Sequence, residues 1–196
     1  MKTILDQHAL DQLFLTARSY NQFTEEAVSD EAIQALYDLL KWGPTSMNTQ
    51  PARYLFLRSP EAKERLLPAM KASNLEKTKG APVSVLIASD TEFYEHLPTQ
   101  FKPYDAKPLF MQNEGLAKET ALRNSSLQGA YLMLAARALG LDCGAMSGFD
   151  ADKVNAEFFP DGKWKVNFIV NLGYGTDSGY YPRGPRLDFH QVAQIV

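Results

Sequence analysis

Two stretches decide how this chain is read: Arg18-Ser19-Tyr20-Asn21-Gln22-Phe23 and Pro44-Thr45-Ser46-Met47-Asn48-Thr49-Gln50-Pro51. An arginine presents five N–H donors in a rigid fork that suits phosphate, and the adjacent serine and asparagine can add neutral hydrogen bonds. The second stretch is a loop with a proline at each end, and its hydroxyl and amide groups can face a flat heterocycle. The pairing suggests a site for a flavin nucleotide.

The two stretches resemble the nitroreductase family of flavin mononucleotide (FMN) enzymes. In that family the first helix ends in an Arg-Ser-x-Arg-x-Phe pattern, and the second helix runs into Pro-Ser-x-x-Asn-x-Gln-Pro. The resemblance extends over nearly the whole chain, and Asn21 departs from the usual second arginine. Within the family, Lys41-Trp42-Gly43-Pro44-Thr45-Ser46 and Arg123-Asn124-Ser125-Ser126-Leu127-Gln128 look most like the malonic semialdehyde reductases of pyrimidine catabolism.

Length and composition narrow the classes of protein. The 196 residues suit a single domain, 1–196, that can bury a core without disulfides or metals. The balance of 20 basic and 23 acidic side chains argues against a nucleic-acid surface. A lone Cys143, no signal-peptide pattern and no apolar run of membrane length favour a cytoplasmic protein outside the membrane. Because His8, His96 and His190 are scattered, we expect no metal site.

Apolar spacing predicts most of the elements. Residues 10–17 form an amphipathic pattern that predicts a first helix ending close to Arg18. Ser29 is a suitable N-cap for a second helix that delivers the chain to Gly43-Pro44. Further patterns predict strands over 54–57, 83–88 and 166–172, a helix beginning at Pro60, and a short helix capped by Asp150.

Two segments carry expectations about packing. Residues 91–113 interleave aromatic residues with prolines, which predicts a long excursion with little regular structure: either a surface loop pinned by its aromatics or a lid over a pocket. Residues 116–139 are apolar on nearly all sides, so we expect a helix that is buried on nearly all sides and stopped by Gly140. A second subunit would cover one of its faces.

The order of helices and strands is not the regular succession of a doubly wound nucleotide-binding fold. Gly173-Tyr174-Gly175 lacks a third glycine, which makes a Rossmann dinucleotide site unlikely. The resemblance implies instead an α+β nitroreductase-like sandwich, in which a mainly antiparallel sheet is flanked by helices. It also implies a two-fold homodimer whose interface creates two flavin sites.

The resemblance implies further FMN-binding residues. Asn74 and Lys77 match the family's pair at the pyrimidine edge of the flavin, where an ammonium favours the reduced anion; the alternative is a solvated turn. Residues 144–148 match a small-residue segment that crosses the ring. The full expected set is Arg18, Ser19, Asn21, Pro44, Thr45, Ser46, Asn48, Asn74, Lys77, Ala145, Met146, Ser147, Gly148, and the C-terminal phosphate cations Arg183 and Arg186, whose alternative is a basic tail without a ligand.

The activity that follows is an FMN-dependent NAD(P)H oxidoreductase with alternating half-reactions, in which flavin performs the hydride transfer and no catalytic side chain is required. The subgroup resemblance implies reduction of malonic semialdehyde (3-oxopropanoate) to 3-hydroxypropanoate. Its carboxylate needs a donor, for which the candidates are Tyr94, Tyr104, Arg123 and Asn124. The alternatives are a broad nitroarene, quinone or enone reductase, a flavin-binding protein without turnover, and a helical dimerisation module without a cofactor.

Overall fold

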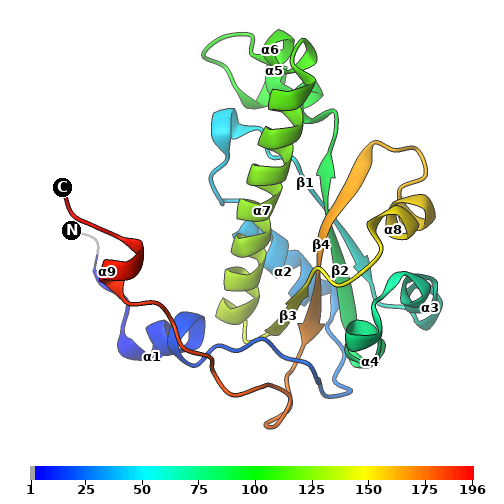
Figure 1. Ribbon diagram of the computed structural model, residues 1–196, viewed down its shortest axis with the longest axis vertical. Coiled ribbons are helices and arrows are strands. Elements are labelled where there is room, and N and C mark those ends of the chain that lie inside the picture. The colour runs from blue at the N-terminus through cyan, green and yellow to red at the C-terminus, as the bar shows by residue number, and fades with distance from the viewer. Residues whose placement is uncertain (1–2) are drawn as a thin grey trace.

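A four-stranded antiparallel sheet organises the computed structural model, which describes residues 3–196. The strand order is β1-β2-β4-β3, so β1 and β3 are the edge strands. Helices cover both faces (Figure 1). The strands are β1 (Ala52–Leu57), β2 (Val83–Asp90), β3 (Asp142–Met146) and β4 (Trp164–Gly173).

Strand β2 shows why the sheet needs two layers of helices. All its side chains are buried, and their alternation sends successive residues to opposite faces. Val85 and Ile87 join the core under α2 (Asp30–Leu40) and α7 (Glu114–Ala138). Leu86 and Ala88 join the second core, under α3 (Pro60–Leu66) and α8 (Ala151–Phe158), on the side where α4 (Ala72–Gly80) also lies. The predicted α+β sandwich is confirmed.

The predicted helix signals are also confirmed. The Ser29 hydroxyl accepts the Ala32 N–H at 3.1 Å, and the Asp150 carboxylate accepts the Lys153 N–H at 3.1 Å. Gly140, with φ of 79°, follows the last turn of α7 in the left-handed conformation that glycine favours.

The predicted first helix is present and ends close to Arg18, although its last turn is not α-helical. Helix α1 covers Gln7–Leu10 and continues as a π-helical turn over Asp11–Leu15, with its C-cap at Thr16. The chain then turns to bring Tyr20 against the edge of β3, where its N–H donates to the Cys143 carbonyl oxygen at 2.9 Å. This pairing fixes the chain that follows the helix against the edge of the sheet.

The prediction of little regular structure in residues 91–113 is wrong as well. The segment contains a 3₁₀ turn (Phe93–His96), α5 (Leu97–Gln100) and α6 (Lys107–Met111). The buried rings of Phe93 and Phe110 lie 5.0 Å apart and form a small core against the N-terminal half of α7. These short helices form because the segment has its own apolar cluster to pack around. The aromatics do pin it to the body of the protein.

After β4 the chain returns to the N-terminal segment. Bridges pair Tyr20 with Tyr180 and Phe23 with Gly175, and a last short helix, α9, covers Phe189–Val192. The segment around α1 and the C-terminal segment with α9 lie on the same side of the molecule, away from the sheet (Figure 1). The N-terminal arginine stretch and the C-terminal arginines therefore lie side by side.

Candidate functional site

A cationic cavity of about 510 Å³ lies where the two ends of the chain meet the edge strand β3. Five basic side chains line it and no acidic one does. Its lining residues are Phe14, Ala17, Arg18, Ser19, Asn21, Lys77, Arg137, Ala145, Tyr181, Pro182, Arg183, Gly184 and Arg186. The structure thus brings together seven of the residues expected to bind FMN.

A glycine allows the Arg18 stretch to approach the sheet. A Cβ at Gly144 would collide with the Tyr20 carbonyl oxygen, so only glycine permits this close pairing with β3. Arg18 then lies over the Tyr180 ring, with its guanidinium carbon 4.8 Å from the ring centroid, and donates to the Tyr181 carbonyl oxygen. Contacts among the N-terminal stretch, Gly144 in β3 and the C-terminal tyrosines therefore fix the position of the Arg18 side chain.

The other cations come from the C-terminal segment and from α4. Arg183 donates to the carbonyl oxygens of Leu15 and Ala17 at 2.7 and 2.8 Å. Arg186 donates only to nearby carbonyls of its own segment. The Lys77 ammonium lies 5.7 Å from the centroid of the Tyr181 ring.

None of the five cations forms a salt bridge within the part of the chain that the structure describes, residues 3–196. In addition, the Arg137 Nε is buried without a hydrogen-bond partner there. Buried or clustered charges of one sign are unfavourable unless an opposite charge compensates them. The donor set and the orphaned nitrogen therefore fit a phosphate group.

The remaining residues of β3 suit close approach by a flat ring. Ala145 is exposed and faces the cavity, whereas Met146 points inward, where its sulfur accepts from the Thr78 hydroxyl at 3.6 Å. The Asn74 amide donates to the Gly148 carbonyl oxygen at 3.1 Å and so fixes the end of this segment. Ser147 is exposed beside it.

The polar loop over residues 44–50 does not reach this cavity within one chain. The Ser46 N–H donates to the Asn124 side-chain oxygen at 2.9 Å, and the Asn48 amide donates to the Gln100 carbonyl oxygen at 3.0 Å. The cavity, in contrast, touches α7 at Arg137. These two points of α7 are separated by about 20 Å along the helix axis. Pro44, Thr45, Ser46 and Asn48 therefore form a separate polar surface.

The loop has an unusual backbone. Met47, Asn48 and Gln50 have φ of 50°, 51° and 41°, in the left-handed region that side chains other than glycine rarely adopt. The Thr45 hydroxyl accepts the Gln50 N–H at 3.2 Å, and the Gln50 amide donates to the Asn48 side-chain oxygen at 2.9 Å. Such strain persists where the surroundings over-determine it, and it is concentrated at functional sites.

The expected substrate donors lie apart from the cationic cavity. Tyr104 is exposed, with its hydroxyl 3.9 Å from the Met47 sulfur of the polar loop. Arg123 forms an exposed salt bridge with Glu119, one turn away on α7. Asn124 differs from the expectation: it is 2% exposed, and it bonds to Ser46 and to the Thr120 carbonyl oxygen. It supports the loop because both ends of its amide are engaged inside the protein.

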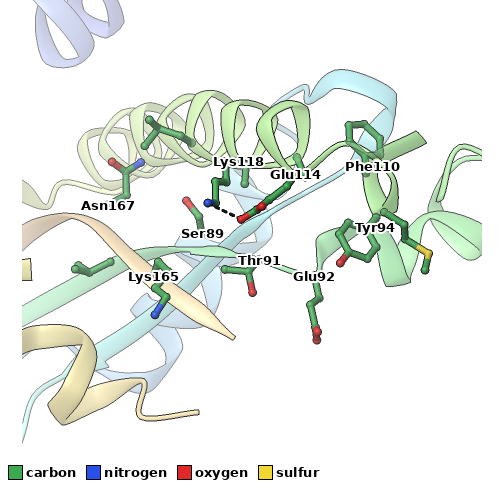
Figure 2. Close-up of a pocket in the computed structure, with 14 residues that line it drawn as sticks. Ser89, Thr91, Glu92, Tyr94, Phe110, Glu114, Lys118, Lys165 and Asn167 are labelled. Carbon is green, nitrogen blue, oxygen red and sulfur yellow. Dashed lines mark ion pairs between the residues drawn. The ribbon is translucent and has the colours of Figure 1, made fainter. Parts of the chain in front are cut away.

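Tyr94 lines a second cavity of about 590 Å³, between α6, the N-terminal half of α7 and the sheet (Figure 2). Its walls are mainly apolar and include Phe110. Figure 2 shows the side chains of Glu114 and Lys118 pointing toward each other, and their charged atoms lie 2.6 Å apart. One of the two lysines that line this cavity, Lys118, is therefore already paired, in contrast to the cations of the cationic cavity.

Sequence reasoning missed Arg137, Phe14, Tyr181 and Pro182 as lining residues. A cation in the last turn of a helix is already explained by the helix dipole, so Arg137 carried no distinguishing signal. Phe14, Tyr181 and Pro182 belong to residue types that occur throughout the chain, so their identity gave no signal. Only the return of the C-terminal segment to α1 gives them their place.

The Cys143 thiol, which lies beside the cavity, is in its unreactive protonated form near neutral pH. Burial raises the pKa of Cys143 to about 12, so the thiol stays protonated near neutral pH. Burial also raises the pKa of the neighbouring Asp142 carboxyl and of the Tyr20 hydroxyl. Because the thiolate is the reactive form of cysteine, Cys143 is not positioned as a nucleophile.

Known proteins are similar to this chain in sequence. A family model described as the nitroreductase family matches residues 15–174. A protein of Ralstonia nicotianae, named as a candidate NADH dehydrogenase/NAD(P)H nitroreductase, is 54% identical over 192 residues, which cover 98% of each chain.

The chain belongs to the nitroreductase family. The resemblance to this family and the expectation of an NAD(P)H-dependent oxidoreductase are therefore confirmed, whereas the subgroup resemblance stays a prediction.

Solved structures agree on the fold of this nitroreductase-family chain. A candidate nitroreductase of Exiguobacterium sibiricum, crystallised in complex with FMN, has a TM-score of 0.83 at 22% identity and covers 100% of this chain and 99% of its own. An enone reductase of gut-bacterial fatty-acid saturation has a TM-score of 0.79 at 19% identity, over 98% of this chain and 100% of its own.

Two other kinds of site are absent from residues 3–196. Residues 3–196 contain no group of three or more histidine, cysteine, aspartate or glutamate side chains placed to hold a metal ion. Over the same residues, no helix combines the length and apolar character needed to cross a membrane.

Proposed function

We propose that this chain is an FMN-dependent oxidoreductase that is reduced by NADPH or NADH and acts as a homodimer of single-domain subunits, residues 1–196. The observation that carries the proposal is the cavity with five basic and no acidic side chains at the edge of β3. Arg18, Arg183 and Arg186 would hold the phosphate, because charge-assisted hydrogen bonds from guanidinium groups suit its oxygens. The names of the relatives support both the cofactor and the reductant.

The exposed face of α7 supports the homodimer. Leu127 and Tyr131 lie one turn apart on the same side of α7, are 47% and 38% exposed, and lie between the level of the polar loop and that of the cavity. Neighbouring exposed apolar side chains of this kind favour a protein partner. A two-fold axis across the middle of α7 would cover this face and place the loop of one chain beside the cavity of the other. The flavin site would then contain both stretches with which the sequence began.

The protein's own groups position and polarise the cofactor. When bound, FMN supplies the hydride chemistry, accepting a hydride from NAD(P)H and passing it to a second substrate. The Lys77 ammonium, held above the Tyr181 ring at the rim of the cavity, favours negative charge on the ring system. The exposed backbone around Ala145 allows close approach to a flat ring.

For the second substrate we infer malonic semialdehyde, from the resemblance of residues 41–46 and 123–128 to the reductases of that compound. Tyr104 and Arg123 are exposed and could meet its carboxylate in the dimer. A broad nitroarene, quinone or enone reductase is the second candidate, favoured by the nitroreductase name of the relative and by the fold shared with an enone reductase.

Anaerobic stopped-flow absorbance tests the proposal. Purified protein should contain one FMN per chain, which NADPH or NADH bleaches and the acceptor reoxidises. Malonic semialdehyde should act with a higher kcat/KM than a neutral aldehyde of equal size, because specificity is differential transition-state binding. Equal rates with both aldehydes and a faster reaction with a quinone would favour the broad reductase. Bound flavin that neither nucleotide bleaches would point to a binding protein without turnover.

A further inference from the structure

Arg137 occupies a position that the proposed function leaves unexplained. It lies in the last turn of α7 and lines the cationic cavity on one side. On its other side it lines a neighbouring cavity of about 540 Å³, together with Asp142. It thus stands in the wall between a surface of basic groups and one that contains acids.

The protein satisfies only part of the hydrogen-bonding capacity of the Arg137 side chain. One terminal N–H donates to the Leu13 carbonyl oxygen at 3.0 Å, which ties α7 to the N-terminal segment. Its Nε is buried without a partner, and over residues 3–196 it forms no salt bridge. The nearby Asp142 carboxylate instead accepts the Gly175 N–H at 2.9 Å.

A purely structural role does not account for an arginine here. One hydrogen bond to a carbonyl oxygen needs a single donor, which a neutral glutamine also has. A guanidinium that is partly buried, with no salt bridge over residues 3–196 and with an orphaned nitrogen, is unfavourable unless an anion compensates it. The Asp142 carboxylate lies near enough to interact with the charge of Arg137 but forms no salt bridge with it. The only stretch of the cavity wall that lacks the expected charge is at Asn21, which brings a neutral amide.

We propose that Arg137 is a phosphate-binding residue of the flavin site and supplies the positive charge that Asn21 does not. This inference rests on the proposed function, because it takes the phosphate of FMN as the anion. A free terminal N–H of Arg137 would donate to a phosphate oxygen while the other keeps its bond to Leu13. Two arginines that line the same cavity, Arg18 and Arg137, would then bind one phosphate.

The test compares FMN with riboflavin, which has the same ring and ribityl chain but no phosphate. Apoprotein is titrated with each ligand, and quenching of flavin fluorescence gives the Kd. The variants are Arg137→Gln and Arg137→Lys, both of which can keep a bond to the Leu13 carbonyl oxygen. Arg65→Ala is the matched control, because Arg65 pairs with Glu157 on the opposite face of the sheet. Melting temperatures of the apoproteins report on folding.

Arg137→Gln should weaken FMN binding by about 10- to 100-fold, the loss of one charge-assisted hydrogen bond, and change riboflavin binding by less than about threefold. Arg137→Lys should fall between this variant and wild type, and Arg65→Ala should match wild type. If Arg137 only ties the helix to Leu13, both ligands weaken equally, and that result overturns the inference. So does FMN binding that is unchanged in both variants.

Ligand binding by the wild-type protein distinguishes a failure of the proposed function from a failure of the role proposed for Arg137. Should it bind FMN no more tightly than riboflavin, the cavity is not a phosphate site and the proposed function fails with this inference. Should it prefer FMN strongly while the Arg137 variants keep the same preference, the proposed function stands and only the role of Arg137 is overturned.

Discussion

The two ends of α7 serve different kinds of recognition. At its C-terminal end, five cations without carboxylate partners surround a cavity. Near its N-terminal half, Asn124 holds a neutral loop whose backbone is locked in left-handed conformations. One end offers charge, and the other offers shape and neutral hydrogen bonds. Because about 20 Å of helix separates them, a single chain does not bring these two groups together in one cavity.

The largest expected effect comes from breaking the face that joins the halves. Leu127→Glu places a charge on the exposed apolar face of α7, where a second copy would otherwise cover it. We expect monomers that lose FMN affinity by about 1000-fold or more, since the loss would include a whole half-site. Light scattering and flavin absorbance along a dilution series measure both. A monomer that keeps FMN at wild-type affinity would refute the homodimer.

Removing one cation should have the next largest effect. Arg18→Ala should weaken FMN by about 10- to 100-fold and leave riboflavin nearly unchanged, because a single charge-assisted bond to phosphate is lost. Arg186→Ala should show the same selectivity. Fluorescence titration with both ligands measures it. Equal weakening of both flavins by Arg18→Ala would assign Arg18 a structural task, through its contacts with Tyr180 and Tyr181.

A variant that weakens the support of the polar loop should not distinguish FMN from riboflavin in the same titration. Asn124→Ala removes the acceptor for the Ser46 N–H and leaves buried polar groups unpaired, which costs about 1 to 3 kcal/mol of stability. Both flavins should bind more weakly, each by roughly fivefold, because in the proposed dimer the loop would contact the flavin ring and not the phosphate. Urea unfolding supplies the stability. A selective loss of FMN in this variant would contradict the division between the two ends.

The smallest effect is expected at Cys143. Its folded pKa of about 12 lies above the ordinary value of 9.0, so the folded protein holds the proton longer than the unfolded chain. Stability should therefore fall as pH rises from about 9 to about 12, and this thiol should contribute no pH dependence between pH 6 and 8. Alkylation kinetics check the point. Rapid modification of the native protein at pH 8 would contradict it.

Local sequence signals predict much of the fold. Caps at Ser29 and Asp150, the left-handed Gly140 and the alternation in β4 depend on neighbours along the chain, and they predict their elements correctly. The π-helical turn that ends the first helix has no such local signal. The segment 91–113 failed because its small apolar core is completed by α7.

The site divides in the same way. The Arg18 and 183–186 stretches could be predicted, since clustered cations retain their character in any fold. Arg137 could not, because a cation at a helix end has a local explanation. Asn124 was assigned to substrate, yet its surroundings are set by a loop from far earlier in the chain. Long-range packing decides which polar groups remain free for a ligand.

Mixed dimers test the central claim, that two chains share each site. One chain carries Arg18→Ala and Arg186→Ala, and the other carries Thr45→Ala and Asn48→Ala; two affinity tags isolate the heterodimer. If loop and cavity meet across the interface, one site has both defects and the other has none. The account predicts one FMN per heterodimer at wild-type affinity, although both parent dimers bind weakly. A heterodimer that binds FMN as weakly as its parents would show that each chain builds its site alone.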